Sequence, residues 1–377
     1  MTVQQFYNQD HQFFISKNCG HTAAEIAQQP AMWRKLDTYM QEMAQTIRNY
    51  MAGVAPNARV ILTGAGSSGF VGRAVAGYAA QGTGKNCEAI HTTDLVSAPQ
   101  MYLFENTPTL LISFARSGNS PESVGAVEYA RRTVKNLWEI AIVCDGGSKL
   151  AGLTRESKNG LLLVMPEGTN DNGFAMTSSV STMILAGCAV LSGGKTIDIP
   201  ALCEAVEKNA NSYVKLAEEC ASWGSERAWY LGSGPLQALV QEGALKMMEL
   251  TNGAVVAGHN SATEFRHGPK TVMNPKTVTV HFISPNKFTA KYDIDLLNEL
   301  YLQKTSNKIV AIQSGDENAD LSVPYAAMSE VAAGIQGLVF MQLLSMFTSL
   351  KLGVPTDNPS PSGLVNRVVQ GVTVYPI

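Results

Sequence analysis

Short runs of β-branched and aliphatic residues alternate with helix-like segments through most of this 377-residue chain. The runs are apolar on both faces, and each is followed by a turn that contains Gly or Ser. Such runs, alternating with helices, are typical of a parallel sheet that helices cover on both sides. The seven predicted strands are 60–62, 109–112, 140–143, 161–164, 229–231, 278–282 and 309–312.

The two halves of the chain resemble each other. Gly64-Ala65-Gly66 and Gly232-Ser233-Gly234 both connect a predicted strand to a helix, about 168 residues apart (64 to 232). Repetition at this spacing favours two related α/β domains. We therefore expect a fold of two tandem doubly wound parallel-sheet domains, preceded by helices and followed by an irregular, proline-containing tail. The predicted segments are 1–50 (helices), 51–200 (first domain), 201–355 (second domain, entered by a linking helix at about 195–225) and 356–377 (tail).

Low charge limits the partners of this chain. Charged residues make up 16% of it, below the roughly 25% of a typical soluble domain. The net charge is −3, so no basic surface for nucleic acid is expected. Normal apolar content combined with low charge favours burial of some surface against another subunit. We expect a homo-oligomer, and a dimer in particular.

Neither a membrane span nor a secretory signal is expected. The most apolar stretch, 331–347, is interrupted by Gln336 and Gln342, and it falls short of the roughly 18 apolar residues that a spanning helix needs. We interpret it as a buried helix. The first residues show no basic segment followed by an apolar one, and the six cysteines form no CxxC pair. Reduced thiols fit a cytoplasmic protein.

Three loops of the first half share a Gly-, Ser- and Thr-rich composition: 64–69, 116–120 and 177–179. The first two follow predicted strands directly, and all three precede helices. In an open α/β sheet, such loops converge at the carboxyl ends of the strands. Helix N-termini and hydroxyl groups donate hydrogen bonds, so the crevice suits a phosphate dianion. The alternative for any one loop is that its Ser or Thr only caps the helix.

The first loop also satisfies the pattern GxGxxG after a strand, which is the dinucleotide fingerprint. That interpretation requires an acidic residue about 20 positions later, at the end of the next strand. Glu88 lies at the start of its strand and Asp94 comes late. A dinucleotide would also leave the Ser/Thr content of the other two loops unexplained.

The second half carries a row of charged residues in an otherwise apolar helix. At 100° per residue, positions i, i+4 and i+7 lie within about 60° of one another, so Glu242, Lys246 and Glu249 share one face. A surface row of ion pairs is the alternative. The segment Ser261 to Pro269 then adds His267 in a short, sharply ended stretch. Periodicity alone leaves both interpretations open.

These residues resemble the double sugar-isomerase (SIS) domain family over about 55–377. The resemblance rests on Gly64, Gly66 and Ser68, on Ser117, Gly118 and Ser120, on the spacing of Glu242, Lys246 and Glu249, and on His267. The isomerase half of glucosamine-6-phosphate synthase belongs to this family. The subgroup of galactosamine-6-phosphate deaminase/isomerases, formerly called tagatose-6-phosphate ketose/aldose isomerases, is closer, because its tail shares the sequence Asp-Asn-Pro-Ser-Pro-Ser-Gly found here at 357–363.

The resemblance implies a role for each matched position. Ser68, Ser117 and Ser120 would bind the sugar phosphate, with Arg116 in place of the family's more usual neutral residue. In the third loop, an ungapped match puts Met176 opposite a phosphate-binding serine of the synthase, so Thr177 is taken for that role. No cofactor is implied. No metal is implied either, because the six histidines lack paired ligand spacing with carboxylates or thiolates.

The resemblance places catalysis in the second half. Glu249 would move the proton between C2 and C1 of the open-chain sugar, and His267 would open the pyranose ring, either within one chain or from a second subunit. Lys246 would stabilise developing negative charge, and Glu242 would orient it. The synthase's tail lysine, which forms a Schiff base, has no counterpart, because Arg367 is the only nearby cation. No amino-terminal glutaminase with a cysteine nucleophile is evident, so glutamine-dependent synthesis is not expected.

The leading hypothesis is conversion of galactosamine 6-phosphate to tagatose 6-phosphate and ammonia in amino sugar catabolism. A base at C2 gives an enolamine, protonation at C1 gives a ketimine, and water hydrolyses the ketimine. An aldose–ketose isomerase acting on a hexose phosphate without nitrogen is one alternative. A non-catalytic sugar-phosphate sensor is another, although such a sensor needs no row of Glu242, Lys246 and Glu249, and no helix-turn-helix segment is evident.

Overall fold

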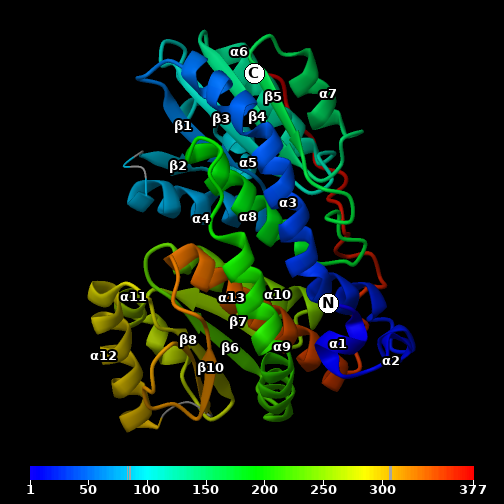
Figure 1. The fold of residues 1–377 in the computed structure, drawn as a ribbon, viewed down its shortest axis with the longest axis vertical. Coiled ribbons are helices and arrows are strands. Elements are labelled where there is room, and N and C mark those ends of the chain that lie inside the picture. The colour runs from blue at the N-terminus through cyan, green and yellow to red at the C-terminus, as the bar shows by residue number, and fades with distance from the viewer. Residues whose placement is uncertain (83, 85, 305–307) are drawn as a thin grey trace. The chain divides into compact units, whose positions relative to one another are not determined.

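Two five-stranded parallel sheets flanked by helices make up the fold (Figure 1). The computed structural model describes residues 1–82, 84, 86–304 and 308–377. By packing, the chain divides into two compact units. The first-sheet unit comprises 31–171, 178–199 and 362–377, and the second-sheet unit comprises 1–30, 172–177 and 200–361. The α/β class predicted from the sequence is confirmed. The predicted segment boundaries stay a prediction, since these units are defined by packing rather than by continuity of the chain.

The first-sheet unit has the strand order β2-β1-β3-β4-β5, with all neighbours parallel. β3 is buried along its whole length, as its unbroken apolar run predicts. The strands are β1 (Arg59–Thr63), β2 (Cys87–Ala89), β3 (Thr109–Ala115), β4 (Leu137–Val143) and β5 (Gly160–Val164).

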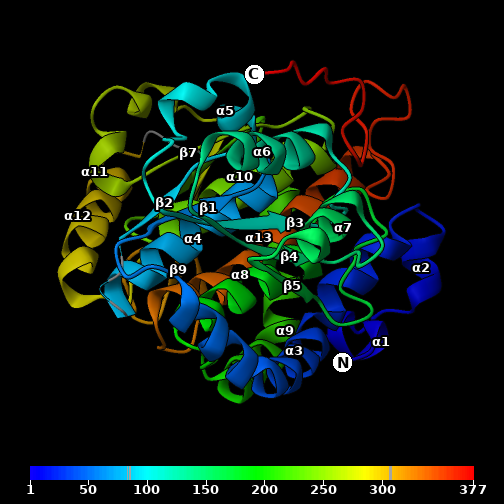
Figure 2. The same ribbon diagram turned by 90° about the horizontal axis from the view of Figure 1, so that it is seen from above.

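Helices cover both faces of this sheet (Figure 2). On one face, α5 (Thr92–Ser97), α6 (Pro121–Thr133) and α7 (Lys149–Glu156) pack their apolar residues against the strands. On the other face lie α4 (Ser67–Gly82) and α8 (Ser178–Leu191), which contact each other. A Cβ at Gly187 of α8 would lie 3.0 Å from the Phe114 ring of β3 and 2.7 Å from Val75 of α4. Glycine thus brings α8 close to both neighbours. The short 3₁₀ helix η1 (Pro99–Met101) follows α5, and α3 (Gly20–Gly53) precedes β1.

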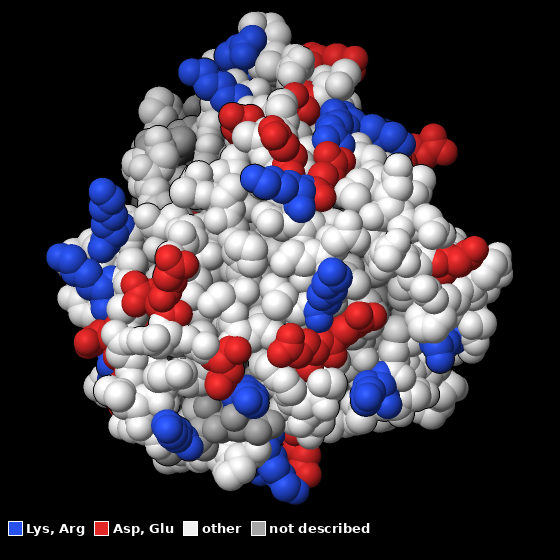
Figure 3. Space-filling view, turned by 60° about the horizontal axis from the view of Figure 1, so that its bottom comes forward, with Lys and Arg blue, Asp and Glu red and all other residues white. Residues whose placement is uncertain are grey.

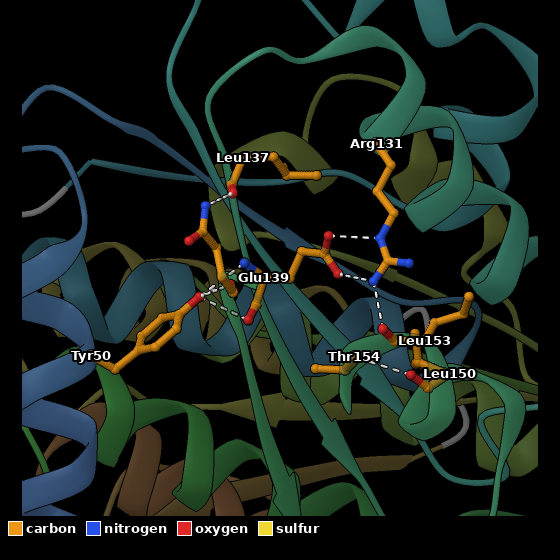
Figure 4. Close-up of polar contacts among 8 residues, drawn as sticks. Tyr50, Arg131, Leu137, Glu139, Leu150, Leu153 and Thr154 are labelled. Atoms are coloured by element: carbon orange, nitrogen blue, oxygen red, sulfur yellow. Dashed lines mark hydrogen bonds and ion pairs between the residues drawn. The ribbon is translucent and has the colours of Figure 1, made fainter. Parts of the chain in front are cut away.

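A partly buried polar network fastens helices to the amino-terminal ends of β4 and β5 (Figure 4). The guanidinium of Arg131 on α6 donates two hydrogen bonds of 2.8 Å each to the Glu139 carboxylate on β4, and a third of 2.6 Å to the Leu153 carbonyl on α7. The Tyr50 hydroxyl on α3 donates to the backbone carbonyls of Glu139 and Asn159 at 2.9 and 2.6 Å. These residues lie at the edge of the sheet opposite the Ser-rich loops, so their role is structural.

The second-sheet unit has the strand order β10-β9-β8-β6-β7, again with parallel neighbours. α11 and α12 cover one face of this sheet, and α10 packs against α13. The strands are β6 (Arg227–Leu231), β7 (Val256–Asn260), β8 (Thr277–Phe282), β9 (Lys308–Gln313) and β10 (Leu321–Pro324). The helices are α1 (Val3–Tyr7), α2 (His11–Ile15), α9 (Ile199–Ser222), α10 (Leu236–Leu250), α11 (Ala262–Phe265), η2 (Pro269–Val272), α12 (Lys287–Gln303) and α13 (Glu330–Leu352).

All seven predicted strands are present, and the described residues contain three further strands that were not among those predicted. The three are β2, β7 and β10, and each lies at an edge of its sheet. Edge strands are only partly buried, so they need no continuous apolar run. β10 alternates buried and exposed residues, and β7 contains glycine, histidine and asparagine. The missed strands are thus edge strands without an apolar run, whereas β5, the other edge strand of the first sheet, has such a run at 161–164 and was predicted.

The apolar helix predicted at 331–347 is α13. Within the described part of the chain, α13 is the one helix long and apolar enough to cross a membrane, and 94% of its most apolar window is buried inside the structure. It packs against α10, so the interpretation as a buried helix is confirmed.

The tail motif at 357–363 begins by capping the longest helix. The Asp357 carboxylate accepts hydrogen bonds from the backbone N–H groups of His21 and Thr22, at 2.9 and 2.8 Å, in the first turn of α3. A carboxylate here satisfies unpaired N–H groups and complements the positive end of the helix dipole. Residues 353–377 contain no helix or strand, as predicted.

Candidate functional site

The first Ser-rich loop, 64–69, is a tight turn between β1 and α4. Gly66 has a φ of +55°, in the left-handed region that favours glycine. A Cβ at Gly64 would lie 2.5 Å from the backbone of Ser68. Ser68 itself is 5% exposed and lies in the first turn of α4. The glycines thus allow the backbone to close tightly around a helix N-terminus that carries Ser68.

The second loop, 116–120, follows β3, which is the neighbour of β1. Gly118 has a φ of +60°. Ser120 caps α6, and its hydroxyl lies 2.7 Å from that of Ser123. Arg116 is buried, and its guanidinium donates a 2.7 Å hydrogen bond to the Arg367 carbonyl of the tail. Loops that follow adjacent parallel strands open at the same edge of the sheet, so Ser68, Ser117 and Ser120 belong to one edge.

The third loop differs from the other two, because an internal carboxylate occupies its helix N-terminus. Asp171 accepts hydrogen bonds from the backbone N–H groups of Ser178 and Ser179, at 3.0 and 2.9 Å, and from the Ser179 hydroxyl. These are the donors that a phosphate would use. Sequence reasoning missed Asp171, since an acidic residue seven positions before a helix carries no spacing signal. Thr177 is completely buried just before α8, and its role stays a prediction.

The dinucleotide interpretation of the first loop finds no support in the contacts of its acidic residue. Glu88 forms an ion pair with Arg59, whose Nη2 donates to Glu88 Oε2 at 2.6 Å. Arg59 lowers the pKa of Glu88 through this hydrogen bond and its charge, against a smaller opposing effect of burial. The carboxylate is thus committed to a neighbouring cation on β1. The His91 ring, just beyond the carboxyl end of β2, packs against Gly69. A Cβ at Gly69 would lie only 2.3 Å from the ring atoms of His91.

The charged row of the second half is buried in α10. Lys246 is 0% exposed and lies between two carboxylates, with Glu242 Oε1 at 3.3 Å from its Nζ and Glu249 Oε2 in direct contact. Burial alone would lower the pKa of Lys246, but the charges of Glu242 and Glu249 and their hydrogen bonds raise it above its usual value. The ammonium therefore stays charged at neutral pH.

Burial rules out a solvated row of surface ion pairs. Glu242 is 1% exposed, whereas Glu249 is 26% exposed. Burying such charges costs several kcal/mol per ion, which is a large part of the stability of a typical domain. Glu249 is the member of the row whose carboxylate reaches solvent, and hence the one that a substrate can reach.

The close packing of α13 explains why a glycine, Gly243, follows Glu242 in α10. A Cβ at Gly243 would lie 2.6 Å from the Met341 sulfur and 3.1 Å from the Met341 Cβ on α13. The glycine thus lets α13 approach α10 beside the charged row. Close packing of this kind holds the rotamers of neighbouring side chains.

His267 lies in an exposed turn immediately after α11. Its backbone N–H donates to the Glu264 carbonyl at 2.9 Å, and Gly268 follows with a φ of +122° that an L side chain rarely adopts. The required glycine accounts for the His-Gly sequence. The structure brings Glu242, Lys246 and Glu249 together, but among the residues it describes no hydrogen bond or ion pair joins the His267 ring to them.

Among the described residues, no group of three or more His, Cys, Asp or Glu side chains is arranged to hold a metal ion. Charged side chains of both signs are interspersed on the face drawn in Figure 3, with wide uncharged surface between them. Arg367, the tail cation, donates hydrogen bonds to the Asp171 carbonyl and, at 3.4 Å, to the Asn170 side chain. Its guanidinium therefore lies beside the loop that precedes α8.

Two parallel-sheet units, Ser-rich junctions after adjacent strands and the Glu–Lys–Glu row are the features on which the resemblance to the SIS class rests. The SIS-domain family model matches residues 54–192. D-galactosamine-6-phosphate deaminase AgaS of Escherichia coli O157:H7 is 38% identical over 369 residues, which cover 94% of this chain and 95% of that protein. The chain therefore belongs to the SIS-domain family that contains the AgaS proteins.

Two further comparisons agree. D-galactosamine-6-phosphate deaminase AgaS of Shewanella sp. (strain ANA-3) is 39% identical over 363 residues, covering 94% of this chain and 92% of that protein. The crystal structure of tagatose-6-phosphate ketose/aldose isomerase from Escherichia coli is 35% identical, with a TM-score of 0.88 over 94% of this chain and 96% of that chain. The resemblance drawn from the sequence motifs is confirmed.

Proposed function

We propose that this protein is a deaminating isomerase, which converts D-galactosamine 6-phosphate to tagatose 6-phosphate and ammonia. The observation that carries the proposal is the 38% identity, over nearly the whole chain, to a protein named as that deaminase. The buried row on α10 supplies chemistry that fits it.

The proposed reaction begins with the open-chain aldehyde. The Glu249 carboxylate removes the proton from C2, and the electron pair forms the C1–C2 double bond while the carbonyl oxygen takes up a proton. The resulting enolamine then receives a proton at C1, and the nitrogen lone pair completes a C=N bond at C2. Water adds to C2 of this ketimine, and the C–N bond breaks to release ammonia and the ketose, so the release of nitrogen is a hydrolysis.

Charged neighbours of Glu249 support this sequence. Lys246 is fully buried with a raised pKa, so its ammonium can stabilise negative charge that develops on the substrate oxygen. Glu242 holds Lys246 from the other side. We assign ring opening to His267, whose exposed position in a turn leaves its ring accessible.

We assign phosphate binding to Ser68, Arg116, Ser117 and Ser120, with Thr177 as a further candidate. Two helix N-termini after adjacent strands, a buried guanidinium and hydroxyl groups at one edge of a sheet support this assignment. Because Asp171 already occupies the N-terminus of α8, we expect Thr177 to contribute less than the other four.

An ammonia-release assay tests the function directly. We expect ammonia and tagatose 6-phosphate in equal amounts from galactosamine 6-phosphate, and much slower release from its gluco epimer. Galactose 6-phosphate, which lacks nitrogen, is the control. Rapid isomerisation of that control, with no ammonia from either amino sugar, would instead establish a plain aldose–ketose isomerase, the activity in the name of the Escherichia coli structure.

We also propose a homodimer located in the cytoplasm. The low charge and the exposed His267, without a bond to Glu249 in its own chain, fit a site completed by a second subunit.

The six free cysteines fit a reducing compartment. Mixing His267→Ala and Glu249→Gln chains tests sharing: shared sites recover part of the activity in hybrid dimers, whereas sites formed by single chains recover none. Light scattering gives the mass, and cell fractionation gives the location.

A further inference from the structure

One carboxylate of α12 holds the chain on both sides of the turn that carries His267. Arg266 Nε lies 2.9 Å from Glu299 Oε2, and Lys270 Nζ forms an ion pair with Glu299 Oε1. Arg266 begins the turn and Lys270 lies in η2, which follows the turn directly, so a single side chain holds the chain on both sides of the turn. His267 lies between these two residues and is exposed.

The Glu299 carboxylate is itself held by a firmly packed helix. Leu296 and Leu300, on either side of it in α12, are 0% exposed and pack with Phe265 of α11 in one apolar cluster. Gln303, one helical turn further on, donates a 3.3 Å hydrogen bond to Glu299 Oε1. The anchor of the turn is thus a carboxylate on a rigid element, which is the arrangement that positions a functional side chain well.

The turn needs such an anchor, because its centre is a glycine. Gly268 has a φ of +122°, and in the described part of the chain no atom beyond its sequence neighbours lies within 4 Å of the place where a Cβ would be. Inside the turn, Gly268 is restrained by the ring of the following Pro269 and by the hydrogen bonds that Thr271 donates to its carbonyl, at 3.1 Å from the N–H and 3.0 Å from the hydroxyl. The two cations on Glu299 restrain the turn from outside.

Glu299 remains charged at the pH of an assay. The hydrogen bond from Lys270 is the largest influence on its pKa, and with the hydrogen bond from Arg266 and both positive charges it lowers that pKa, although partial burial acts in the opposite direction. The Arg266 and Lys270 contacts are therefore hydrogen bonds between opposite charges, which are stronger than neutral ones.

We propose that Glu299 is a positioning residue for His267: by holding Arg266 and Lys270 together, it places the imidazole where the sugar ring is opened. The inference rests on the proposed role of His267 in ring opening. Glu299 does not contact the substrate in this account, and it acts only through the turn.

Substitutions of Glu299 test the proposal against a matched control. Glu299→Gln keeps the shape of the side chain but removes its charge, and we expect kcat for galactosamine 6-phosphate to fall on the order of tenfold with KM changed less than about twofold. Glu299→Asp, which keeps the charge, should recover part of the loss. Asp295→Asn is the control, because Asp295 lies on the same helix, 3.7 Å from Arg266, and is 79% exposed. It should leave kcat unchanged.

A double variant separates this inference from the function on which it rests. If Glu299 acts through His267, Glu299→Gln should cause no further loss of kcat in a His267→Ala background. Equal losses in both backgrounds, or normal kcat in Glu299→Gln, would overturn the positioning role while leaving His267 in place. If His267→Ala alone keeps the wild-type kcat, then the proposed role of His267 fails instead. Circular dichroism and thermal melting of each variant exclude loss of fold as the cause.

Discussion

At the scale of single residues, Lys246 is the centre of the proposed catalytic row. It is a fully buried cation between Glu242 and Glu249 on its own helix. The spacing of the three residues could be read from the sequence, but their burial could not, because the same spacing is common on solvated helix faces. What distinguishes this row is the close approach of α13 at Gly243.

Removal of the Lys246 charge should therefore destabilise the protein. In Lys246→Met, Glu242 is left buried without this cation, and we expect the free energy of unfolding to fall by about 3 kcal/mol. Glu249→Gln should cost less than about 1 kcal/mol, since Glu249 is partly exposed. Urea unfolding followed by circular dichroism measures both. Equal stability of Lys246→Met and the wild type would argue against a buried charge pair.

His281 on β8 leads to a second prediction for a single residue, which concerns the effect of pH on stability. The residue is 0% exposed, and among the described residues neither ring nitrogen has a hydrogen-bond partner. Burial first, and then the charge of Arg266, lowers its pKa from 6.5 to about 3. Between these values the unfolded chain binds a proton that the folded protein does not. Stability is thus lost as pH falls from 6.5 toward 3, by up to about 1.4 kcal/mol per pH unit.

The variant His281→Leu isolates this effect. Burial of Asp293 raises the pKa of its carboxyl from 3.8 to about 6, which stabilises the folded state as pH falls through that range and partly masks the histidine. Since Asp293 is present in both proteins, its contribution cancels in the difference between them. We expect the stability of the variant, relative to that of the wild type, to increase steadily as pH falls below 6.5. Parallel curves from thermal melts between pH 7 and pH 4 would contradict the assignment.

At the scale of elements, the predictions from sequence succeeded wherever burial on both faces imposed a pattern. β3 and β8, which are buried throughout, were predicted from their apolar runs alone. The edge strands β2, β7 and β10 were not, because half-exposed strands need no such run. The same limit applies to the third loop, where Ser and Thr suggested an anion site. Asp171, which fills that helix N-terminus, could be placed only by the fold.

The first Ser-rich loop, 64–69, leads to a prediction about substrate binding. In Gly64→Ala, the new methyl group would lie 2.5 Å from the backbone of Ser68, so the loop must shift. We expect KM for the phosphorylated sugar to rise at least about tenfold, as phosphate donors lose their alignment. Gly152→Ala in α7 is the control, because among the described residues no atom outside its own helical turn lies within 4 Å of that Cβ position. This control should keep the wild-type KM and gain up to about 1 kcal/mol of stability. An unchanged KM in Gly64→Ala would remove the loop from the phosphate site.

At the scale of the whole molecule, the duplication of the α/β unit was visible in the sequence, through two strand–GxG–helix junctions. The structure shows that the two sheets have become different. In the first, the loops after adjacent strands present Ser68, Ser117 and Ser120 beside glycines. In the second, Ser233 lies between the two glycines of the matching junction, opposite Ala65 of the first, and donates a 2.6 Å hydrogen bond to the buried Asp293 carboxylate, so it serves an internal contact. The position of Asp293 on α12 could not be inferred from the repeat.

We propose that Glu249 moves the proton between C2 and C1 in a reaction that releases ammonia. The most direct measurement is the incorporation of solvent deuterium at C1 of tagatose 6-phosphate, formed from galactosamine 6-phosphate in D₂O and followed by proton NMR. With the wild type, we expect deuterium in the product and one ammonia per sugar. With Glu249→Gln, correctly folded by circular dichroism, both should fall by at least about a hundredfold. Deuterium incorporation at the wild-type rate in that variant would contradict the account.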